Sequence, residues 1–151
     1  MEYAGYITGF ADGEGSFSVS FNSRSKLRTG LEIRPSFAIA QNVASLEALQ
    51  KIRDYFGCGN IRYSAGDNTY KYEVRSIDDL TKIIIPHFIK FPLQTAKSKD
   101  FENFKVICEM MTKNHHRQPD CLNRIIDLAM SMNPSGKRKY NKEQLLQFVT
   151  R

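Results

Sequence analysis

The segment from Gly5 to Gly15, Gly-Tyr-Ile-Thr-Gly-Phe-Ala-Asp-Gly-Glu-Gly, decides the fold, together with the alternating stretch that follows it. Its glycines at positions 5, 9 and 13 recur every four residues, a spacing that places them on one face of a helix. Each glycine costs a helix about 1 kcal/mol relative to alanine, so the stripe indicates that another backbone packs close to this face. The chain has no second helix with such a stripe, and we therefore expect the partner to be the same helix of another copy, related by a two-fold axis.

Polar and apolar residues alternate strictly in the stretch 14–22, where Phe17, Val19 and Phe21 share one face. The same period of two recurs in three later stretches, 31–41, 60–64 and 69–75. This period predicts four strands, each with one face packed and one polar face exposed. Pro35 lacks a backbone donor, so we expect the second strand to lie at a sheet edge there or to be bulged.

Helical patterns fill the segments before, between and after these strands. We expect helices over 3–12, 45–56, 76–86, 98–113, 119–132 and 141–150. Ser45 and Ser76 are the expected N-caps, and Pro86 is the expected end of the third helix. The apolar side of the third strand carries Ile61 and Tyr63, which we expect beneath the covering helices.

The bulk composition limits the class of protein. The 151 residues suit one domain with a real core, and no apolar run is long enough to span a bilayer. The N-terminus lacks the pattern of a secretory signal, so we expect a soluble intracellular protein without a membrane partner. Three cysteines without a CxxC pair argue against a zinc site or a disulfide framework, and the net charge of +6 weakly favours a polyanionic partner.

Two carboxylates, Asp12 and Glu14, stand where the first helix is expected to end and the first strand to begin. A two-fold axis along paired helices would bring both copies of Glu14 together, and their repulsion would raise one pKa. A divalent cation such as Mg²⁺ removes this conflict, and metals held between carboxylates are an established means of phosphodiester cleavage. The alternative is that the Asp-Gly pair only forms a turn or a cap at the end of the helix.

Residues 7–15, Ile-Thr-Gly-Phe-Ala-Asp-Gly-Glu-Gly, resemble the LAGLIDADG motif of homing endonucleases. The expected order of helix, two strands, helix, two strands and helices matches the αββαββα core of that family over about residues 3–112, and about 113–151 resemble its extra C-terminal helices only loosely. The resemblance implies one α+β domain over 1–151, with a saddle-like antiparallel sheet. Thr8 departs from the usual small apolar residue of the motif, and Glu14 from the commoner aspartate.

The resemblance also assigns roles to single residues. Glu14 is the implied metal ligand, with the backbone carbonyl of Gly13 beside it. Gln41 matches a polar residue that orients solvent. Lys97 matches the active-site lysine of the family, with Lys90 and Lys99 as competitors for that role. The implied metal is Mg²⁺, with Mn²⁺ or Ca²⁺ able to occupy the site, Ca²⁺ without activity, and no small-molecule cofactor is implied.

Family members with a single motif act as homodimers, as the glycine stripe also indicates. The residues expected at the dimer interface lie on the motif helix: Gly5, Thr8, Gly9 and Asp12. The implied function is a site-specific endonuclease that makes a staggered double-strand cut at the centre of a pseudo-palindromic DNA target. Two half-sites of about one helical turn each give a target on the order of 20 base pairs.

The polar faces of the strands are the expected DNA-reading surface, because a two-stranded ribbon fits the major groove. The candidates are Ser18, Ser20, Asn22, Arg24, Lys26, Arg28, Glu32, Arg34, Ser36, Asn60, Arg62, Lys71, Glu73 and Arg75. Arginine suits guanine, asparagine suits adenine and glutamate suits cytosine. The cluster Lys137, Arg138 and Lys139 is expected to contact phosphates, although a plain solvated loop is an equal alternative.

Three other functions remain open. An RNA-splicing maturase and a DNA-binding regulator without cleavage both occur on this scaffold, and a dimeric binding module without nucleic acid is the third. The presence of Glu14 favours an enzyme, and the basic strand faces favour nucleic acid. We expect an intron-encoded protein of a bacterial cytoplasm or an organelle, and the sequence does not specify the DNA target.

Overall fold

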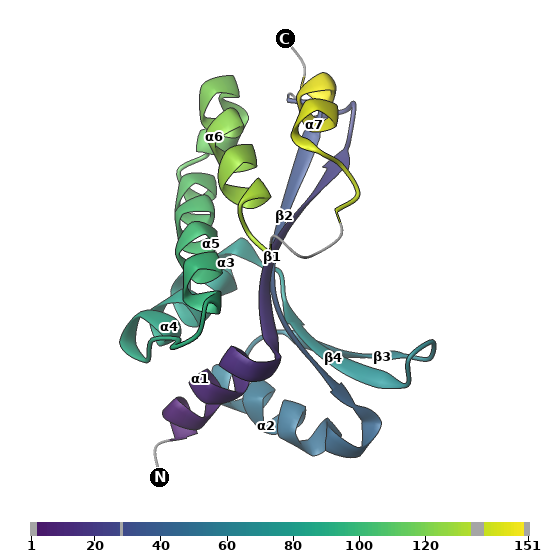
Figure 1. Ribbon diagram of the computed structural model, residues 1–151, viewed down its shortest axis with the longest axis vertical. Helices are drawn as coiled ribbons and strands as arrows, with labels where there is room; N and C mark the ends of the chain where they lie inside the picture. Colours follow the sequence, from purple (N-terminus) through teal and green to yellow (C-terminus); the bar gives the residue numbers. More distant parts are fainter. Residues whose placement is uncertain (1–2, 28, 134–137, 150–151) are drawn as a thin grey trace. The chain divides into compact units, whose positions relative to one another are not determined.

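The computed structural model describes residues 3–27, 29–133 and 138–149, whose helices and strands are drawn in Figure 1. Four strands form one sheet in the order β1-β2-β4-β3, with bounds Gly15–Ser23 (β1), Leu31–Asn42 (β2), Asn60–Ser64 (β3) and Thr69–Val74 (β4). β4 lies between β2 and β3 and is antiparallel to both. The α+β class and the order of elements predicted from the sequence are confirmed.

The described helices lie close to the predicted segments. The α-helices are α1 (Tyr3–Glu14), α2 (Leu46–Phe56), α3 (Ile77–Asp79), α4 (Ile85–Lys90), α5 (Lys97–Thr112), α6 (Pro119–Met130) and α7 (Lys142–Phe148). Shorter helical segments are η1 (Val43–Ser45), the π-helix η2 (Leu80–Ile84) and η3 (His115–Arg117). None of the helices within the described ranges combines the length and apolar character needed to cross a bilayer.

The chain divides into two compact units. One contains the chain up to Phe17 together with Ser36–Ser98, and the other contains Ser18–Pro35 and the chain from Lys99 onward. β1, β2 and α5 each contribute residues to both units. The motif helix, β3 and β4 belong to the first unit, and α6 and α7 belong to the second.

An aromatic cluster forms the centre of the first unit. Phe17 of β1, Phe37 of β2 and Phe88 of α4 place their ring centroids 5.0 to 5.4 Å apart. Leu49 and Ile52 of α2 are fully buried. Buried and polar residues alternate along the strands, as the period of two predicts: Phe37 and Ile39 of β2 lie on the same face as their partners Val74 and Tyr72 of β4, and Glu73 lies on the opposite, polar face.

The second unit has a core of its own. Buried apolar residues alternate along its strand segments, at Val19, Phe21, Leu31 and Ile33. The helices bury apolar stripes with helical spacing, at Phe101, Phe104, Ile107 and Cys108 of α5 and at Leu122, Ile125, Ile126 and Ala129 of α6. Both patterns agree with the amphipathic spacing read from the sequence.

The sequence gives expectations for two prolines, Pro35 in the second strand and Pro86 at the end of the third helix. The pairing of β2 with β4 begins at Phe37, beyond Pro35, so the missing donor of Pro35 interrupts no bond to β4. The prediction that the third helix stops near Pro86 is wrong, because helical structure continues to Lys90. The π-helical segment η2 precedes Pro86 and leaves it in the first turn of α4, where a missing N–H is tolerated.

The expectation that Tyr63 packs beneath helices is also wrong. β3 is an edge strand, and the Tyr63 side chain is 53% exposed. Its ring lies 5.2 Å from the ring of Tyr70, and its hydroxyl donates to Asn68 Oδ1 at 2.8 Å. Cross-strand contact with a neighbouring tyrosine therefore replaces burial at this position.

Candidate functional site

The junction between α1 and β1 places Glu14 at the surface. A Cβ atom at Gly15 would lie 2.9 Å from the Ala11 carbonyl oxygen, so only glycine allows the strand to begin so close to the helix. Glu14, the last residue of α1, is exposed. Among the residues that the structure describes, none forms a hydrogen bond or an ion pair with its carboxylate. This junction therefore presents an available hard oxygen ligand.

Asp12, two residues earlier, has a different environment. Its carboxylate accepts hydrogen bonds from the backbone N–H of Gln94 at 2.6 Å and of Thr95 at 3.2 Å, and from the Thr95 hydroxyl at 2.7 Å. Burial opposes ionisation, but these bonds together with the nearby Lys97 lower the pKa of Asp12. Asp12 thus fastens the end of α1 to the segment before α5.

Lys97 fastens the same two segments from the other side. Its Nζ donates to the backbone carbonyls of Ala11 at 2.9 Å and Asp12 at 3.0 Å, at the C-terminal end of α1, where the helix dipole favours a cation. The competing lysines differ, since Lys90 and Lys99 are exposed and Lys90 Nζ lies 5.6 Å from the ring centre of Phe91. Of the three candidate lysines, Lys97 is the one with contacts to the motif helix.

The glycine stripe lies on an open face of α1. Gly5, Gly9 and Gly13 are exposed, and a Cβ atom added at any of them would meet nothing within 4 Å. Packing within the described residues therefore does not account for the glycines. Tyr6 and Phe10 follow Gly5 and Gly9 in sequence and lie beside the stripe, with ring centroids 5.8 Å apart and Tyr6 42% exposed.

The opposite face of α1 is buried, and Thr8 lies on it. The Thr8 hydroxyl donates to the Phe91 carbonyl at 2.9 Å and therefore accepts from His87 Nε2 at 3.1 Å. His87 Nδ1 consequently accepts from the Tyr55 hydroxyl, also at 3.1 Å. Burial lowers the pKa of His87 to about 4, so the ring is neutral near pH 7.

These contacts give partners within the chain to two residues predicted at the dimer interface. Thr8 is buried within its own chain, and the Asp12 carboxylate binds the segment before α5. Helical spacing alone placed both residues beside the glycines, because it does not reveal which flank of the stripe the rest of the chain covers. Tyr6 and Phe10 beside the stripe were not predicted as site residues, although their spacing of four residues, parallel to the glycines, is visible in the sequence.

Two clusters on the polar sheet face each surround one glutamate. In the first unit, the Glu73 carboxylate lies among Ser36, Arg62, Lys71 and Arg75. Burial opposes ionisation of Glu73, but the Ser36 hydroxyl and the three cations outweigh it and lower the pKa.

In the second unit, Glu32 accepts from Arg24 at 2.8 Å and from Asn22 at 3.3 Å, and Arg34 Nε lies at 4.0 Å. The bond from Arg24 is the main cause of the lowered pKa of Glu32. The expectation that Glu32 and Glu73 read cytosine treated both as free acceptors, whereas the protein's own donors already occupy them.

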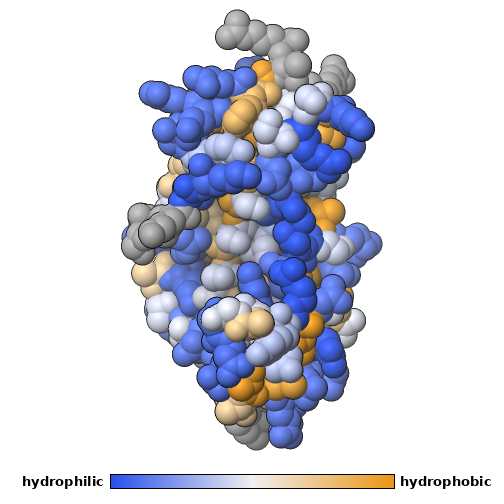
Figure 2. Space-filling model, turned by 90° about the vertical axis from the view of Figure 1, so that its right-hand side faces the viewer, coloured by the Kyte–Doolittle hydropathy of each residue, from blue (hydrophilic) through white to orange (hydrophobic). Residues whose placement is uncertain are grey.

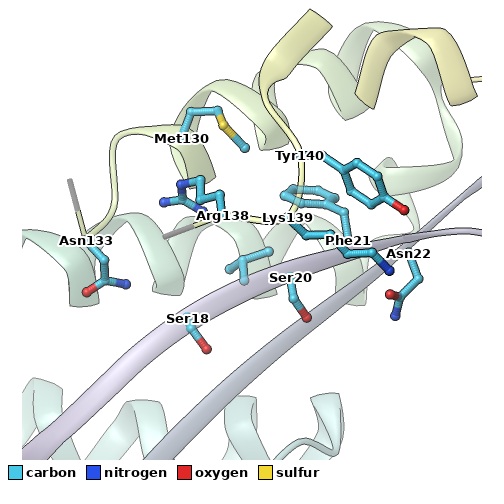
Figure 3. Close-up of a pocket in the computed structure, with 10 residues that line it drawn as sticks. Ser18, Ser20, Phe21, Asn22, Met130, Asn133, Arg138, Lys139 and Tyr140 are labelled. Carbon is cyan, nitrogen blue, oxygen red and sulfur yellow. The ribbon is translucent and has the colours of Figure 1, made fainter. Parts of the chain in front are cut away.

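Other predicted contact residues line a pocket of about 240 Å³ in the second unit, which Figure 3 shows. Ser18 and Ser20 point their hydroxyls away from α6, while the Arg138 guanidinium turns toward the end of that helix. Arg138 donates to the carbonyls of Ala129 and Met132, which uses part of the donor capacity predicted to contact phosphates. Its neighbour Lys139 places Nζ 5.2 Å from the ring centre of Tyr140.

The remaining candidates are less informative. Gln41 is half-buried on β2, and its Nε2 donates to the Ala40 carbonyl at 2.9 Å. Lys26 and Asn60 are exposed, whereas Arg28 and Lys137 lie outside the described residues.

Much of the molecular face in view in Figure 2 is hydrophilic. Within the described ranges, no group of three or more His, Cys, Asp or Glu residues could hold a metal ion.

The model of the LAGLIDADG endonuclease family matches residues 7–108, which include most of the motif helix, the four strands and most of α5. The chain therefore belongs to the LAGLIDADG family of homing endonucleases. It is 32% identical to homing endonuclease I-ApeII of Aeropyrum pernix over 96% of this chain and 89% of that protein. It is also 36% identical to a probable intron-encoded endonuclease of Neurospora crassa, over 85% of this chain and 28% of that protein.

Solved structures agree with this membership. The crystal structure of the homing endonuclease I-TnaI superposes with a TM-score of 0.84 at 33% identity, over 96% of this chain and 94% of that one. I-SmaMI bound to cleaved DNA gives a TM-score of 0.88 at 33% identity, over 97% of this chain but only 48% of that one. This chain thus spans nearly all of I-TnaI and about half of I-SmaMI.

Proposed function

We propose that the chain is a site-specific DNA endonuclease that acts as a homodimer and makes a metal-dependent staggered cut in both strands of a long pseudo-palindromic target. The observation that carries this proposal is the exposed, unengaged Glu14 carboxylate at the end of a helix whose glycine face is open. The names of relatives support the endonuclease activity, and I-SmaMI was crystallised with cleaved DNA. The whole of 1–151 acts as one endonuclease domain.

The dimer forms through α1. Glycines at 5, 9 and 13 let two copies of the helix approach closely, and Tyr6 and Phe10 pack along one edge of the contact. A two-fold axis through this contact brings the two copies of Glu14 to the same end of the helix pair. The match to about half of I-SmaMI supports two copies of this chain as the equivalent of one longer protein.

The donor set at this end fits a hard divalent cation. Glu14 supplies a carboxylate and Gly13 a backbone carbonyl, and two copies supply both kinds of oxygen twice. Mg²⁺ suits such a site because it keeps several waters and accepts phosphate oxygens as further ligands, and when bound it stabilises the charge on the reacting phosphate. I-SmaMI was crystallised with an uncleaved target and Ca²⁺, which supports Ca²⁺ as an occupant without activity.

Lys97 and Gln41 complete the proposed site. Lys97 already contacts the carbonyls of Ala11 and Asp12, so its charge lies beside the last turn of α1. There it holds the end of the motif helix in place and adds positive potential near the reacting phosphate. Gln41 orients a solvent molecule from the end of β2.

The polar strand faces read the DNA in the major groove. The proposed contact residues are Ser18, Ser20, Asn22, Arg24, Lys26, Arg28, Arg34, Ser36, Asn60, Arg62, Lys71 and Arg75, with Lys137 and Lys139 on phosphates. Several relatives are named as intron-encoded endonucleases, which supports an intron as the location of the gene and an organelle or a bacterial cytoplasm as the place of action.

A selection experiment tests this proposal without knowledge of the target. Duplexes of about 24 randomised base pairs are incubated with the protein and Mg²⁺, and the cleaved products are sequenced. We expect enrichment of one pseudo-palindromic sequence with a staggered cut at its centre. Loss of cleavage in Glu14→Gln with retained binding in Ca²⁺ supports the metal role, whereas equal cleavage by this variant excludes it.

A further inference from the structure

Glu73 has a position on the sheet that no other acidic residue on the polar strand faces shares. β4 lies between β2 and β3, and Glu73 pairs with Ala38 on one side and Asn60 on the other. Its side chain is only 11% exposed, compared with 28% for Glu32 in the second unit. Glu73 is therefore a largely covered anion beneath the polar face of the first unit.

Four donors divide between its two carboxylate oxygens. Oε1 lies 3.1 Å from a terminal nitrogen of Arg62 and 3.8 Å from Nε of Arg75. Oε2 accepts from the Ser36 hydroxyl at 3.0 Å and lies 3.6 Å from Lys71 Nζ. The donors come from β2, β3, β4 and the residue after β4, so one carboxylate joins three neighbouring strands.

The three cations around Glu73 remain available to a ligand. The side chains of Arg62, Lys71 and Arg75 are 64%, 44% and 43% exposed, although the acid between them is covered. Each cation uses only part of its donor capacity on Glu73, because guanidinium has five N–H donors and ammonium has three. The three cations therefore face the solvent, and the covered carboxylate of Glu73 lies beneath them.

We infer that Glu73 is a positioning residue for DNA recognition: it holds Arg62, Lys71 and Arg75 in the orientations that read base edges and itself contacts no base. This inference rests on the proposed function, because it requires that the polar face bind DNA. A guanidinium that is already oriented loses less rotamer freedom when it makes a bidentate contact with guanine.

Removal of the Glu73 charge has two opposite effects on binding. The freed cations lose their fixed orientation, so discrimination between bases falls. The same cations then reach phosphates, which carry no sequence information, so affinity for unrelated DNA rises and becomes more dependent on salt. A residue with only a structural role would lower stability without changing either property.

The test compares Glu73→Gln with Glu47→Gln. Glu47 is an 82% exposed residue of α2 that pairs with Lys51, so its substitution removes the same charge away from the sheet. Binding sites are selected by each protein in Ca²⁺ from duplexes of about 24 randomised base pairs, and affinity for an unselected duplex is measured against salt concentration.

We expect Glu73→Gln to lose about tenfold discrimination at one contiguous block of base pairs in each half-site, and to bind the unselected duplex several times more tightly. Its plot of log affinity against log salt becomes steeper by about one unit per protomer. Glu47→Gln matches the wild type in both measurements. Glu73→Asp keeps the charge but has a shorter side chain. We therefore expect it to show the salt dependence of the wild type and a smaller loss of discrimination than Glu73→Gln.

The outcomes separate the inference from the proposed function. A wild type that enriches no sequence contradicts the proposed function and the inference with it. A wild type that enriches a target while Glu73→Gln selects the same sites as Glu47→Gln overturns the inference alone. If circular dichroism shows that Glu73→Gln does not fold, Glu73→Asp, which keeps the charge among Arg62, Lys71 and Arg75, replaces it; weaker selection in one contiguous block supports the inference, and unchanged selection overturns it.

Discussion

The two faces of α1 differ in what the rest of the chain does with them. One face buries Ala4, Ile7, Thr8 and Ala11 and takes part in a continuous chain of hydrogen bonds through His87 to Tyr55. The other face carries Gly5, Gly9 and Gly13, whose missing side chains would meet nothing. Contacts within the chain explain the residues on the buried face of α1. They do not explain why the open face carries glycines.

This difference supports the proposed self-association through the glycine face of α1. Glycine lowers the stability of a helix relative to alanine, and no contact within the described chain compensates for the three glycines on the exposed face. The buried face holds α1 in place with neutral, partnered groups, and in the proposed dimer the open face contacts a second copy. Glu14 ends the helix on which these two faces lie, and its proposed catalytic role requires both of them.

The largest expected effect is at the end of the helix. Glu14→Gln keeps the side-chain length but removes the charge that holds the metal, so the cleavage rate should fall by at least about a thousandfold. Affinity for the selected duplex in Ca²⁺ should change by no more than about threefold. Cleavage in Mg²⁺ and binding in Ca²⁺ measure the two quantities, and a variant that cuts at half the wild-type rate would remove Glu14 from the site.

We expect acid to lower the free energy of unfolding through His87, which packs against the buried face of α1. The pKa of His87 is about 4 in the folded chain and 6.5 in its ordinary state, so the unfolded chain binds a proton first as the pH falls. Stability from this group is complete above pH 6.5 and is lost between 6.5 and about 4, by at most about 3 kcal/mol. Urea unfolding at several pH values measures this loss, and His87→Gln should lack it; an equal slope in both proteins would contradict the neutral ring.

Thr8→Val tests the same face at neutral pH. Valine matches threonine in shape but leaves the Phe91 carbonyl and the His87 N–H without partners, so the free energy of unfolding should fall by about 1 to 3 kcal/mol. Thr8→Ser keeps the hydroxyl and is the matched control, with a smaller loss. Equal thermal stability of Thr8→Val and the wild type would place Thr8 outside the hydrogen-bond chain.

The smallest effect on folding is expected on the open face. Gly9→Ala meets no neighbour within the chain, so the isolated subunit should become more stable by about 0.5 to 1 kcal/mol. The same methyl group separates two paired helices, so the dimer should dissociate about ten times more readily. Thermal unfolding and a sedimentation dilution series measure the two effects, and a dimer as tight as the wild type would remove Gly9 from the contact.

Much of the fold follows from local patterns in the sequence. The strict alternation at Phe17, Val19 and Phe21 predicts a strand correctly, because burial on one face selects apolar residues directly. Pro86 was misread because the widening of the π-helix before it depends on packing, not on the residue itself. Tyr63 was misread because alternation does not distinguish an edge strand from a covered one.

The site could be predicted only in part for a similar reason. The candidate Glu14 comes from the motif and its spacing, and the candidate Lys97 comes from the family resemblance, to which the structure adds the contacts of Lys97 to the motif helix. The partners of Thr8, Asp12 and Glu73 come from residues far away in the chain, so no local pattern contains them. Long-range hydrogen bonds therefore decide which polar residues remain free for DNA or for a second copy.

In the proposed dimer, one Glu14 is only half of an active site. Wild-type protein and Glu14→Gln are mixed, allowed to exchange subunits, and tested for double-strand cleavage of the selected duplex at constant total protein. If both copies of Glu14 are required, the rate follows the square of the wild-type fraction, and an equal mixture retains about one quarter of the activity. A rate that falls in simple proportion, to about one half, would mean that each chain carries a complete site and would contradict the shared active site.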